Sequence, residues 1–245
     1  MKFKLALMLT GLIAFSLKAQ TVDEILNQHI ENSGGKEAWS SIESIEIEAK
    51  MVTPQGEMAM SIKQAKPDHI YSEINMMGQK IIQGYDGTTA WMINPMTGNT
   101  EAQEMPEPLK QQLLANSQSM DSDWIDYKAK GHEVTLEGNE TIDGVETYKI
   151  KLVKNKNNDK PESTAYFFFD TENYIPIVTR VSPTEGPTAG MTIETKLSDY
   201  KETNIGVLMP FHMETAVMGQ STQMVFEEVT MNADIDESIF KMPGK

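Results

Sequence analysis

Apolar and polar residues alternate with a period of two along much of the chain after Ser44. From Ile45 to Met51 every second residue is apolar and the residues between are charged, and the alternation resumes from Met58 to Ile62. Successive side chains of a β-strand point to opposite faces, so this pattern predicts half-buried strands. The apolar runs 81–85 and 90–93 flank Asp86-Gly87, a pair suited to a tight turn, and predict a β-hairpin.

Further strands are predicted through the rest of the chain, near residues 70–76, 132–137, 145–153, 166–169, 174–178, 191–197, 207–218 and 222–231. The alternation lapses between Pro95 and Gly131, where two short amphipathic helices are predicted around Leu109–Leu114 and Met120–Tyr127. Short connections favour pairing between sequence neighbours, and no βαβ repeat occurs. We therefore expect an α+β fold, mainly antiparallel β, with about 11–12 strands in one strongly curved sheet.

A helix is predicted to precede the first strand. Thr21 and Glu24 have the spacing of a capping box, apolar residues then recur at helical spacing, and Gly34-Gly35 ends the pattern. A short second helical turn with Trp39 follows. Because the first helix is apolar on one side only, we expect it to lie against the sheet.

Residues 1–19 have the three parts of a secretory signal peptide, with basic MKFK, an apolar stretch and a small residue, Ala19, at the end. The interpretation is a cleaved leader at 1–19 and one domain at 20–245, located outside the cytoplasm. The chain has no cysteine. We therefore expect neither a disulfide nor a lipid anchor on an N-terminal cysteine.

The balance of charge is strongly acidic. The net charge is −15, and it becomes −18 without Lys2, Lys4 and Lys18 of the leader. Such a surface repels nucleic-acid phosphates and anionic lipid headgroups, so nucleic acid is a poor candidate partner. Solubility is the more common reason for an acidic surface.

Catalytic and metal-binding motifs are not evident. The four histidines are widely spaced and none has a zinc-motif setting, and Asp121–Asp126 resembles only part of a calcium loop. The stretch 219–223 is the nearest approach to a G-x-S-x-G elbow and lacks the second glycine. We expect no catalytic residue, no metal and no cofactor, and hence no enzyme.

Methionine is unusually frequent. Of 18 methionines, Met1 and Met8 lie in the predicted leader, and many of the others occupy apolar strand positions. Methionine fills gaps in cores, which explains most single positions, and it also lines surfaces that accommodate variable apolar partners. We therefore predict a hydrophobic cavity on one face of the sheet. The residues predicted to line it are Ile47, Met51, Met58, Met60, Ile62, Ile74, Met76, Trp91, Ile93, Tyr148, Ile150, Phe167, Phe169, Ile193, Met213 and Met224.

The helical insertion is a candidate lid over that face. Its apolar residues Leu109, Leu113, Leu114 and Trp124 are the predicted lid residues, and plain core packing is the alternative. Burying an acyl chain of sixteen carbons is worth on the order of 10 kcal/mol, at ~0.8 kcal/mol per methylene, so such a chain needs a carrier in water. The residues thus favour a carrier for acyl chains.

Several short motifs resemble one known family. The stretches 31–36 (ENSGGK), 84–87 (GYDG), 90–95 (AWMINP), 198–200 (SDY), 209–212 (MPFH) and 238–243 (SIFKMP) are similar to those of outer-membrane lipoprotein-sorting proteins of the LolA-like superfamily. The resemblance implies an incomplete, half-open barrel with a helical lid, located in the periplasm. It also implies a cavity that carries lipoprotein acyl chains between membrane-bound donor and acceptor proteins. An arginine near the cavity mouth belongs to that mechanism, and Arg180, the sole arginine, is not assigned to it.

Three functions follow as hypotheses. The first is a periplasmic carrier of lipoprotein acyl chains or other hydrophobic ligands toward the outer membrane. The second is an envelope sensor or scaffold that uses the same fold to bind a protein partner, without lipid transport. The third is a hydrolase whose catalytic residues the motifs do not reveal.

Overall fold

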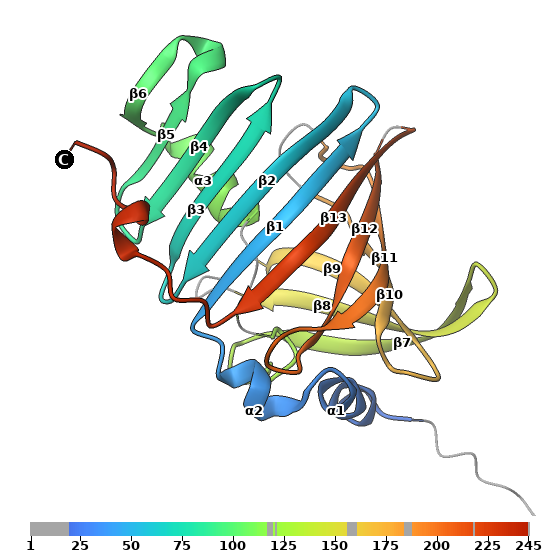
Figure 1. The fold of residues 1–245 in the computed structure, drawn as a ribbon. Coiled ribbons are helices and arrows are strands. Elements are labelled where there is room, and N and C mark those ends of the chain that lie inside the picture. The colour runs from blue at the N-terminus through green and yellow to red at the C-terminus, as the bar shows by residue number, and fades with distance from the viewer. Residues whose placement is uncertain are drawn as a thin grey trace, which may run out of the picture.

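The strands of the protein form one open antiparallel sheet. The computed structural model describes residues 20–116, 120, 122–155, 161–183, 188–217 and 219–244, and the predicted leader lies outside them. Thirteen strands are hydrogen-bonded in the order β6-β5-β4-β3-β2-β1-β13-β12-β11-β10-β9-β8-β7 (Figure 1). Two meanders therefore meet where β1 pairs with β13, and β6 and β7 are the free edges. No helix in the described part of the chain is long and apolar enough to cross a membrane.

The first meander consists of β1 (Ser44–Thr53), β2 (Gly56–Ala65), β3 (His69–Met76), β4 (Gln79–Asp86), β5 (Ala90–Asn94) and β6 (Asn99–Glu104). The second consists of β7 (Glu133–Ile142), β8 (Val145–Asn155), β9 (Pro161–Asp170), β10 (Pro176–Val181), β11 (Ile193–Glu202), β12 (Leu208–Val217) and β13 (Gln220–Met231). The helices are α1 (Val22–Asn32), α2 (Gly35–Ser40) and α3 (Glu107–Asn116), with the short 3-10 helices η1 (Pro95–Thr97) and η2 (Glu237–Phe240).

The structure confirms the mainly antiparallel, half-open sheet and adds one strand to the predicted number. The added strand, β6, lies in the stretch that was predicted to contain no strand. Its sequence NTEAQE lacks apolar alternation and most of it is exposed, so its pairing with β5 makes it a strand. The helix predicted at Met120–Tyr127 is also wrong, because residues 123–131 form turns.

The predicted capping box begins α1. The Thr21 side chain accepts the Glu24 backbone N–H at 3.3 Å, and the Thr21 backbone N–H donates to Glu24 Oε2 at 2.8 Å. Two otherwise unpaired donors of the first helical turn are thereby satisfied. On the sheet side of α1, Ile25 and Leu26 are buried against β8 and β9.

The sheet is curved, and we call its inner face the concave face (Figure 1). Three clusters lie on it. The central one includes Ile47, Met60 and Phe226, and α2 contributes partly buried Trp39. At one side α1 and residues 124–127 cover β8 and β9, and at the other side α3 covers β3–β5.

The convex face has smaller contacts of its own. Trp91 donates its indole N–H to the Phe240 carbonyl at 2.7 Å and lies over Gly84, where a Cβ atom would be 2.3 Å from the indole ring. On β9 and β10, the Arg180 guanidinium lies 4.4 Å from the centre of the Phe168 ring. The strand Tyr166–Phe169 is thus covered on both faces, as its unbroken apolar sequence indicates.

Candidate ligand-binding face

Four methionines form a row across the centre of the concave face. Met51 on β1 lies opposite Met58 on β2 and Met224 on β13, and Met224 lies opposite Met213 on β12. Residues directly opposite each other in an antiparallel pair have Cβ atoms about 5 Å apart. All four side chains are half-buried. We call Met58, Met51, Met224 and Met213 the methionine row.

The layer next to the methionine row, on the side toward α2, is more deeply buried. Here Ala49 lies opposite Met60 and Phe226, and Met60 lies opposite Ile74. Met60 and Phe226 are 8% and 3% exposed. This buried layer fixes the strands beside the methionine row. The flexible thioether side chains of the row can adapt their shape to an apolar ligand.

The concave face is covered unequally. At the α1 side, Trp124 makes edge contacts with Phe167 and Phe169 at ring-centre distances of 4.8 and 5.4 Å, and Ile150 beneath is fully buried. At the α3 side, Leu113 belongs to the same buried cluster as Tyr85. The methionine row lies on the strands between these two regions. Its four half-buried side chains form a continuous apolar strip across adjacent strands, and Met120 packs on the central cluster beside it.

Fourteen of the sixteen residues predicted to line a cavity lie on the concave face. Ile47 and Met60 are buried in the central cluster, and Met51, Ile62, Ile74, Met213 and Met224 pack around it. Tyr148, Ile150, Phe167 and Phe169 belong to the cluster under α1. Register places Met58, Met76 and Ile193 on the same face, outside these clusters. That these residues enclose a chain-sized cavity stays a prediction.

Trp91 and Ile93 do not lie on this face, so their assignment to the lining is wrong. Trp91 lies opposite Gly84, and Ile93 lies opposite Ile82, on the face that η2 partly covers. Their neighbour Ala90 packs on the concave side with Tyr85. Side chains alternate along a strand, so Trp91 and Ile93 must face outward.

The predicted lid residues do not form one group. Leu113 and Leu114 pack on the concave face of β3–β5, whereas Leu109 of the same helix is 41% exposed. Trp124 belongs to the cluster under α1. Leu113 and Leu114 therefore cover one part of the sheet, Trp124 covers another, and Leu109 covers neither.

Polar side chains interrupt the apolar face on β2–β4. Gln64 is 2% exposed, and its side-chain oxygen has no hydrogen-bond partner among the described residues. On the neighbouring strands, the Ser72 hydroxyl donates to Gln83 Oε1 at 3.4 Å. Buried polar atoms are normally paired with protein groups or ordered water, so the Gln64 side-chain oxygen is a position where a water molecule could donate a hydrogen bond. Continuing the alternation of Met58, Met60 and Ile62 by one step places Gln64 on the inner face, but a polar residue at that step gives no sign in the sequence that it is buried.

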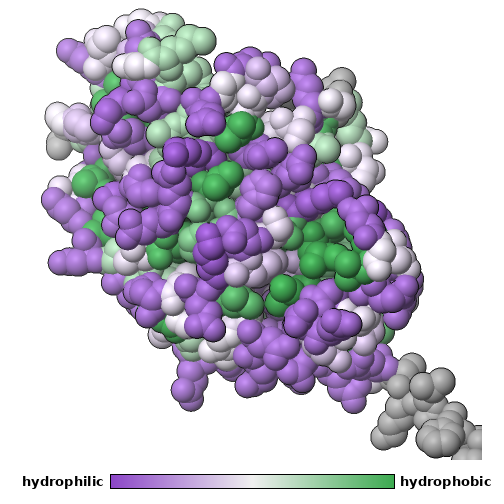
Figure 2. Space-filling view, turned by 45° about the vertical axis from the view of Figure 1, so that its right-hand side comes forward, coloured by the Kyte–Doolittle hydropathy of each residue, from purple (hydrophilic) through white to green (hydrophobic). Residues whose placement is uncertain are grey.

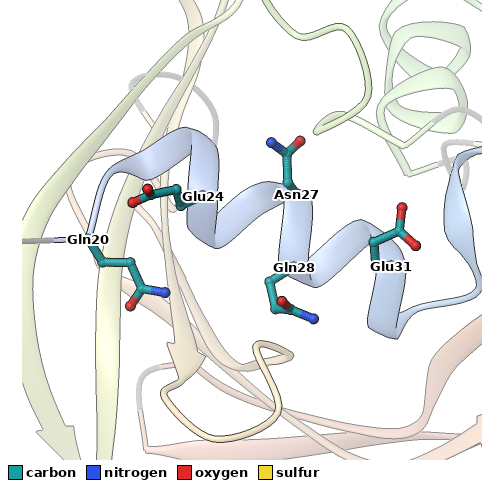
Figure 3. Close-up of a pocket in the computed structure, with 5 residues that line it drawn as sticks. All are labelled: Gln20, Glu24, Asn27, Gln28 and Glu31. Atoms are coloured by element: carbon teal, nitrogen blue, oxygen red, sulfur yellow. The ribbon is translucent and has the colours of Figure 1, made fainter.

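Two hollows border α1. The first, of about 530 Å³, is lined by Gln20, Glu24, Asn27, Gln28 and Glu31 (Figure 3). All five side chains are polar, so this hollow does not suit an acyl chain. The second, of about 300 Å³, has apolar Leu26, Ile30 and Trp124 in its lining, together with the ion pairs Lys36–Asp126 and Lys128–Asp23. Both hollows lie away from the methionine row.

The charge on His29 is controlled by burial under α1. The ring is 7% exposed, and Nδ1 lies 2.9 Å from the Tyr174 carbonyl oxygen. Loss of solvation lowers the pKa of His29 from 6.5 to about 4, and the hydrogen bond to Tyr174 opposes this change. His29 is therefore neutral at pH 7 and anchors α1 to the segment that follows β9.

A serine, a histidine and a glutamine lie in line on the convex face. Ser198 Oγ is 3.1 Å from His212 Nδ1, and His212 Nε2 is 3.3 Å from Gln223 Oε1. Ser198 is exposed, and neither hollow at α1 includes these residues. In the described ranges, no three His, Cys, Asp or Glu side chains are grouped so that they could hold a metal ion.

The open curved sheet, with helices over two parts of its apolar concave face, is the fold of the LolA-like superfamily. The chain is similar to a putative outer membrane lipoprotein-sorting protein domain from Vibrio parahaemolyticus, at 13% identity over 89% of this chain and 95% of that chain, with a TM-score of 0.53. It is also similar to a DUF1329 family protein from Desulfovibrio piger (13% identity, 91% and 98% covered, TM-score 0.55). A third similar structure is that of a LolA superfamily protein from Nitrosomonas europaea, at 12% identity over 91% of this chain and 98% of that chain, with a TM-score of 0.54.

These likenesses establish the fold. A family model described as that of an uncharacterized protein matches residues 70–243, and the chain belongs to this family. No curated protein matches the sequence.

Proposed function

We propose that the protein is a periplasmic carrier that binds a lipoprotein acyl chain, or a hydrophobic ligand of similar shape, on its concave face for transfer toward the outer membrane. The observation that carries this proposal is the methionine row, whose four half-buried side chains lie on adjacent strands. An acyl chain bound along this row would be withdrawn from water, and each buried methylene would contribute ~0.8 kcal/mol to the binding free energy.

The chemistry of the row suits a carrier better than a solid core. A β core is usually filled with β-branched residues that hold one packing arrangement. Here unbranched thioethers occupy neighbouring positions on four strands, so chains of different length and saturation can be accommodated. The likeness of fold to a putative lipoprotein-sorting domain supports an acyl ligand, and the leader-like residues 1–19 support an extracytoplasmic location. Membrane-bound donor and acceptor proteins complete the proposal.

The test compares two carboxylates placed on adjacent residues of β1. Met51 is half-buried on the concave face, and Val52 is half-buried on the convex face. A carboxylate on the ligand surface must lose water when the chain binds, so Met51→Glu is expected to weaken uptake of a fluorescent fatty acid at least tenfold. Val52→Glu is the matched control and is expected to remain within about threefold of the unmodified protein.

Native mass spectrometry of the purified protein provides a second readout, because a carrier is expected to retain lipid. Thermal unfolding of both variants shows whether a loss of uptake reflects a loss of folding. If the unmodified protein takes up no fatty acid and carries no lipid, the carrier proposal is wrong. Equal loss of uptake in Met51→Glu and Val52→Glu would place the ligand elsewhere.

A further inference from the structure

The turns at one end of the central strands carry no charge. The turn from β1 to β2 is Thr53–Gly56, that from β3 to β4 is Met77-Gly78, and that from β5 to β6 is Pro95–Gly98. None of these ten residues is charged, although 23% of the chain is. We call them the neutral rim. In Figure 1 these turns follow one another along the upper margin of the sheet.

The turns at the other end of the same strands are charged. The turn from β2 to β3 contains Lys66 and Asp68, and the turn from β4 to β5 begins at Asp86, the last residue of β4. The face shown in Figure 2 is likewise mostly hydrophilic, with apolar side chains in separate patches. In the first meander, charged residues are thus absent from the turns at one end of the strands and present in the turns at the other end.

Two exposed methionines stand on the neutral rim. Met77 is 89% exposed and Met96 is 49% exposed. The first charged residues after the three turns are Glu57, Lys80 and Glu101, and Lys80 is paired with Glu73 at 2.5 Å. The rim therefore presents two flexible apolar side chains with no ionic group on the turns that carry them.

A lipid surface fits this geometry better than a protein surface does. A stable protein interface buries about 800 Å² of continuous surface on each partner, whereas these methionines stand on separate turns. A fluid lipid interface adapts to separate tips and accepts apolar side chains at its headgroup boundary. Anionic headgroups would repel a chain whose net charge is −15, so a surface without net charge is favoured. We propose that the neutral rim docks on a zwitterionic lipid surface, with Met77 and Met96 inserted at the interface.

Docking in this orientation would bring the methionine row to the membrane. Met51 is two residues before Thr53, and Met58 is two residues after Gly56, so both lie at the rim end of their strands. An acyl chain could then pass between the bilayer and the concave face with a short path through water. The docking site goes beyond the proposed carrier function, because attachment to lipid requires no bound ligand.

The experiment is flotation of the purified protein with phosphatidylcholine vesicles. Burial of apolar side chains at the lipid interface favours binding in proportion to the area withdrawn from water, so replacing both methionines by glutamate is expected to weaken binding strongly. The variant with both Met77→Glu and Met96→Glu is expected to lose at least tenfold in partitioning. Val145→Glu is the matched control, because Val145 is 42% exposed and lies at the start of β8, away from the rim. It is expected to partition within about twofold of the unmodified protein.

Three results would overturn the docking site. They are an unmodified protein that does not float, a double variant that floats equally well, and a Val145→Glu variant that loses as much as the double variant. A fourth contrary result would be stronger flotation on vesicles containing anionic phosphatidylglycerol, because docking on a surface without net charge predicts the opposite. Fatty-acid uptake without vesicles separates the two proposals, because uptake without flotation contradicts docking alone and flotation without uptake contradicts the carrier alone.

Discussion

Protonation of His29 is expected to weaken the attachment of α1 to the sheet. The ring contacts Trp124 and Phe169 edge to face, with ring centres 6.4 and 5.1 Å away, and its Nδ1 faces the Tyr174 carbonyl. Because the folded-state pKa of about 4 is below the unfolded value of 6.5, the unfolded chain binds this proton more readily. The contribution to stability is complete above pH 6.5 and is lost as the pH falls toward 4.

The size of the effect follows from the difference between the two pKa values. Each unit is worth about 1.4 kcal/mol, so a pKa lowered from 6.5 to about 4 corresponds to roughly 3 kcal/mol at the acidic limit. At pH 4.5 most of this, roughly 2.5 kcal/mol, would already be lost. A loss of this size is a large fraction of the stability of a typical domain.

Urea denaturation at pH 7.5 and pH 4.5 measures this contribution when the protein is compared with His29→Leu. Carboxylates titrate in both proteins, so the difference between their pH dependences isolates the histidine. The unmodified protein is expected to lose roughly 2.5 kcal/mol more than His29→Leu between the two pH values. If His29→Leu does not fold, His29→Gln retains an amide donor for the Tyr174 carbonyl. Equal losses in protein and variant would refute the argument.

Two further predictions concern packing on opposite faces of the first meander. Gly84→Ala would place a Cβ atom 2.3 Å from the Trp91 ring. We expect this variant to lower the free energy of unfolding, measured by urea denaturation, by roughly 1–3 kcal/mol, and by less when Trp91 is also replaced by leucine. On α3, Leu113→Ala is expected to cost roughly 2–4 kcal/mol, because Leu113 is 8% exposed, whereas Leu109→Ala, at a position 41% exposed, should change thermal unfolding little. Equal costs for the two α3 variants would contradict the packing of this helix.

The face to which each side chain of a strand points could be predicted well where charged residues alternate with apolar ones. In β1, Glu46 and Glu48 cannot be buried without partners, so Ile45 and Ile47 must face the interior, and both are buried. The capping box at Thr21 was equally local, because its hydrogen bonds span three residues. Both features can be predicted from the sequence because they do not depend on distant residues.

The prediction for Trp91 and Ile93 was wrong because the stretch Ala90–Ile93 is apolar throughout. Alternation assigns no direction to such a run. The direction is set by the pairing of Trp91 with Gly84, which leaves space for the indole, and by the Phe240 carbonyl 149 residues away. The strand β6 is a similar case, since pairing with β5 outweighs its polar sequence.

The mainly antiparallel sheet, the inward side of strands with alternating charged residues, the start of α1 and the abundance of methionine could all be predicted from the amino-acid order. The pairing of β1 with β13 could not be predicted, because the paired residues are 171 to 186 positions apart in the chain and no local pattern encodes such a contact. That pairing brings Met51 and Met224 together and so creates the methionine row. Side-chain preference acts within a few residues, whereas the neighbours of a strand are chosen by the packing of the whole sheet.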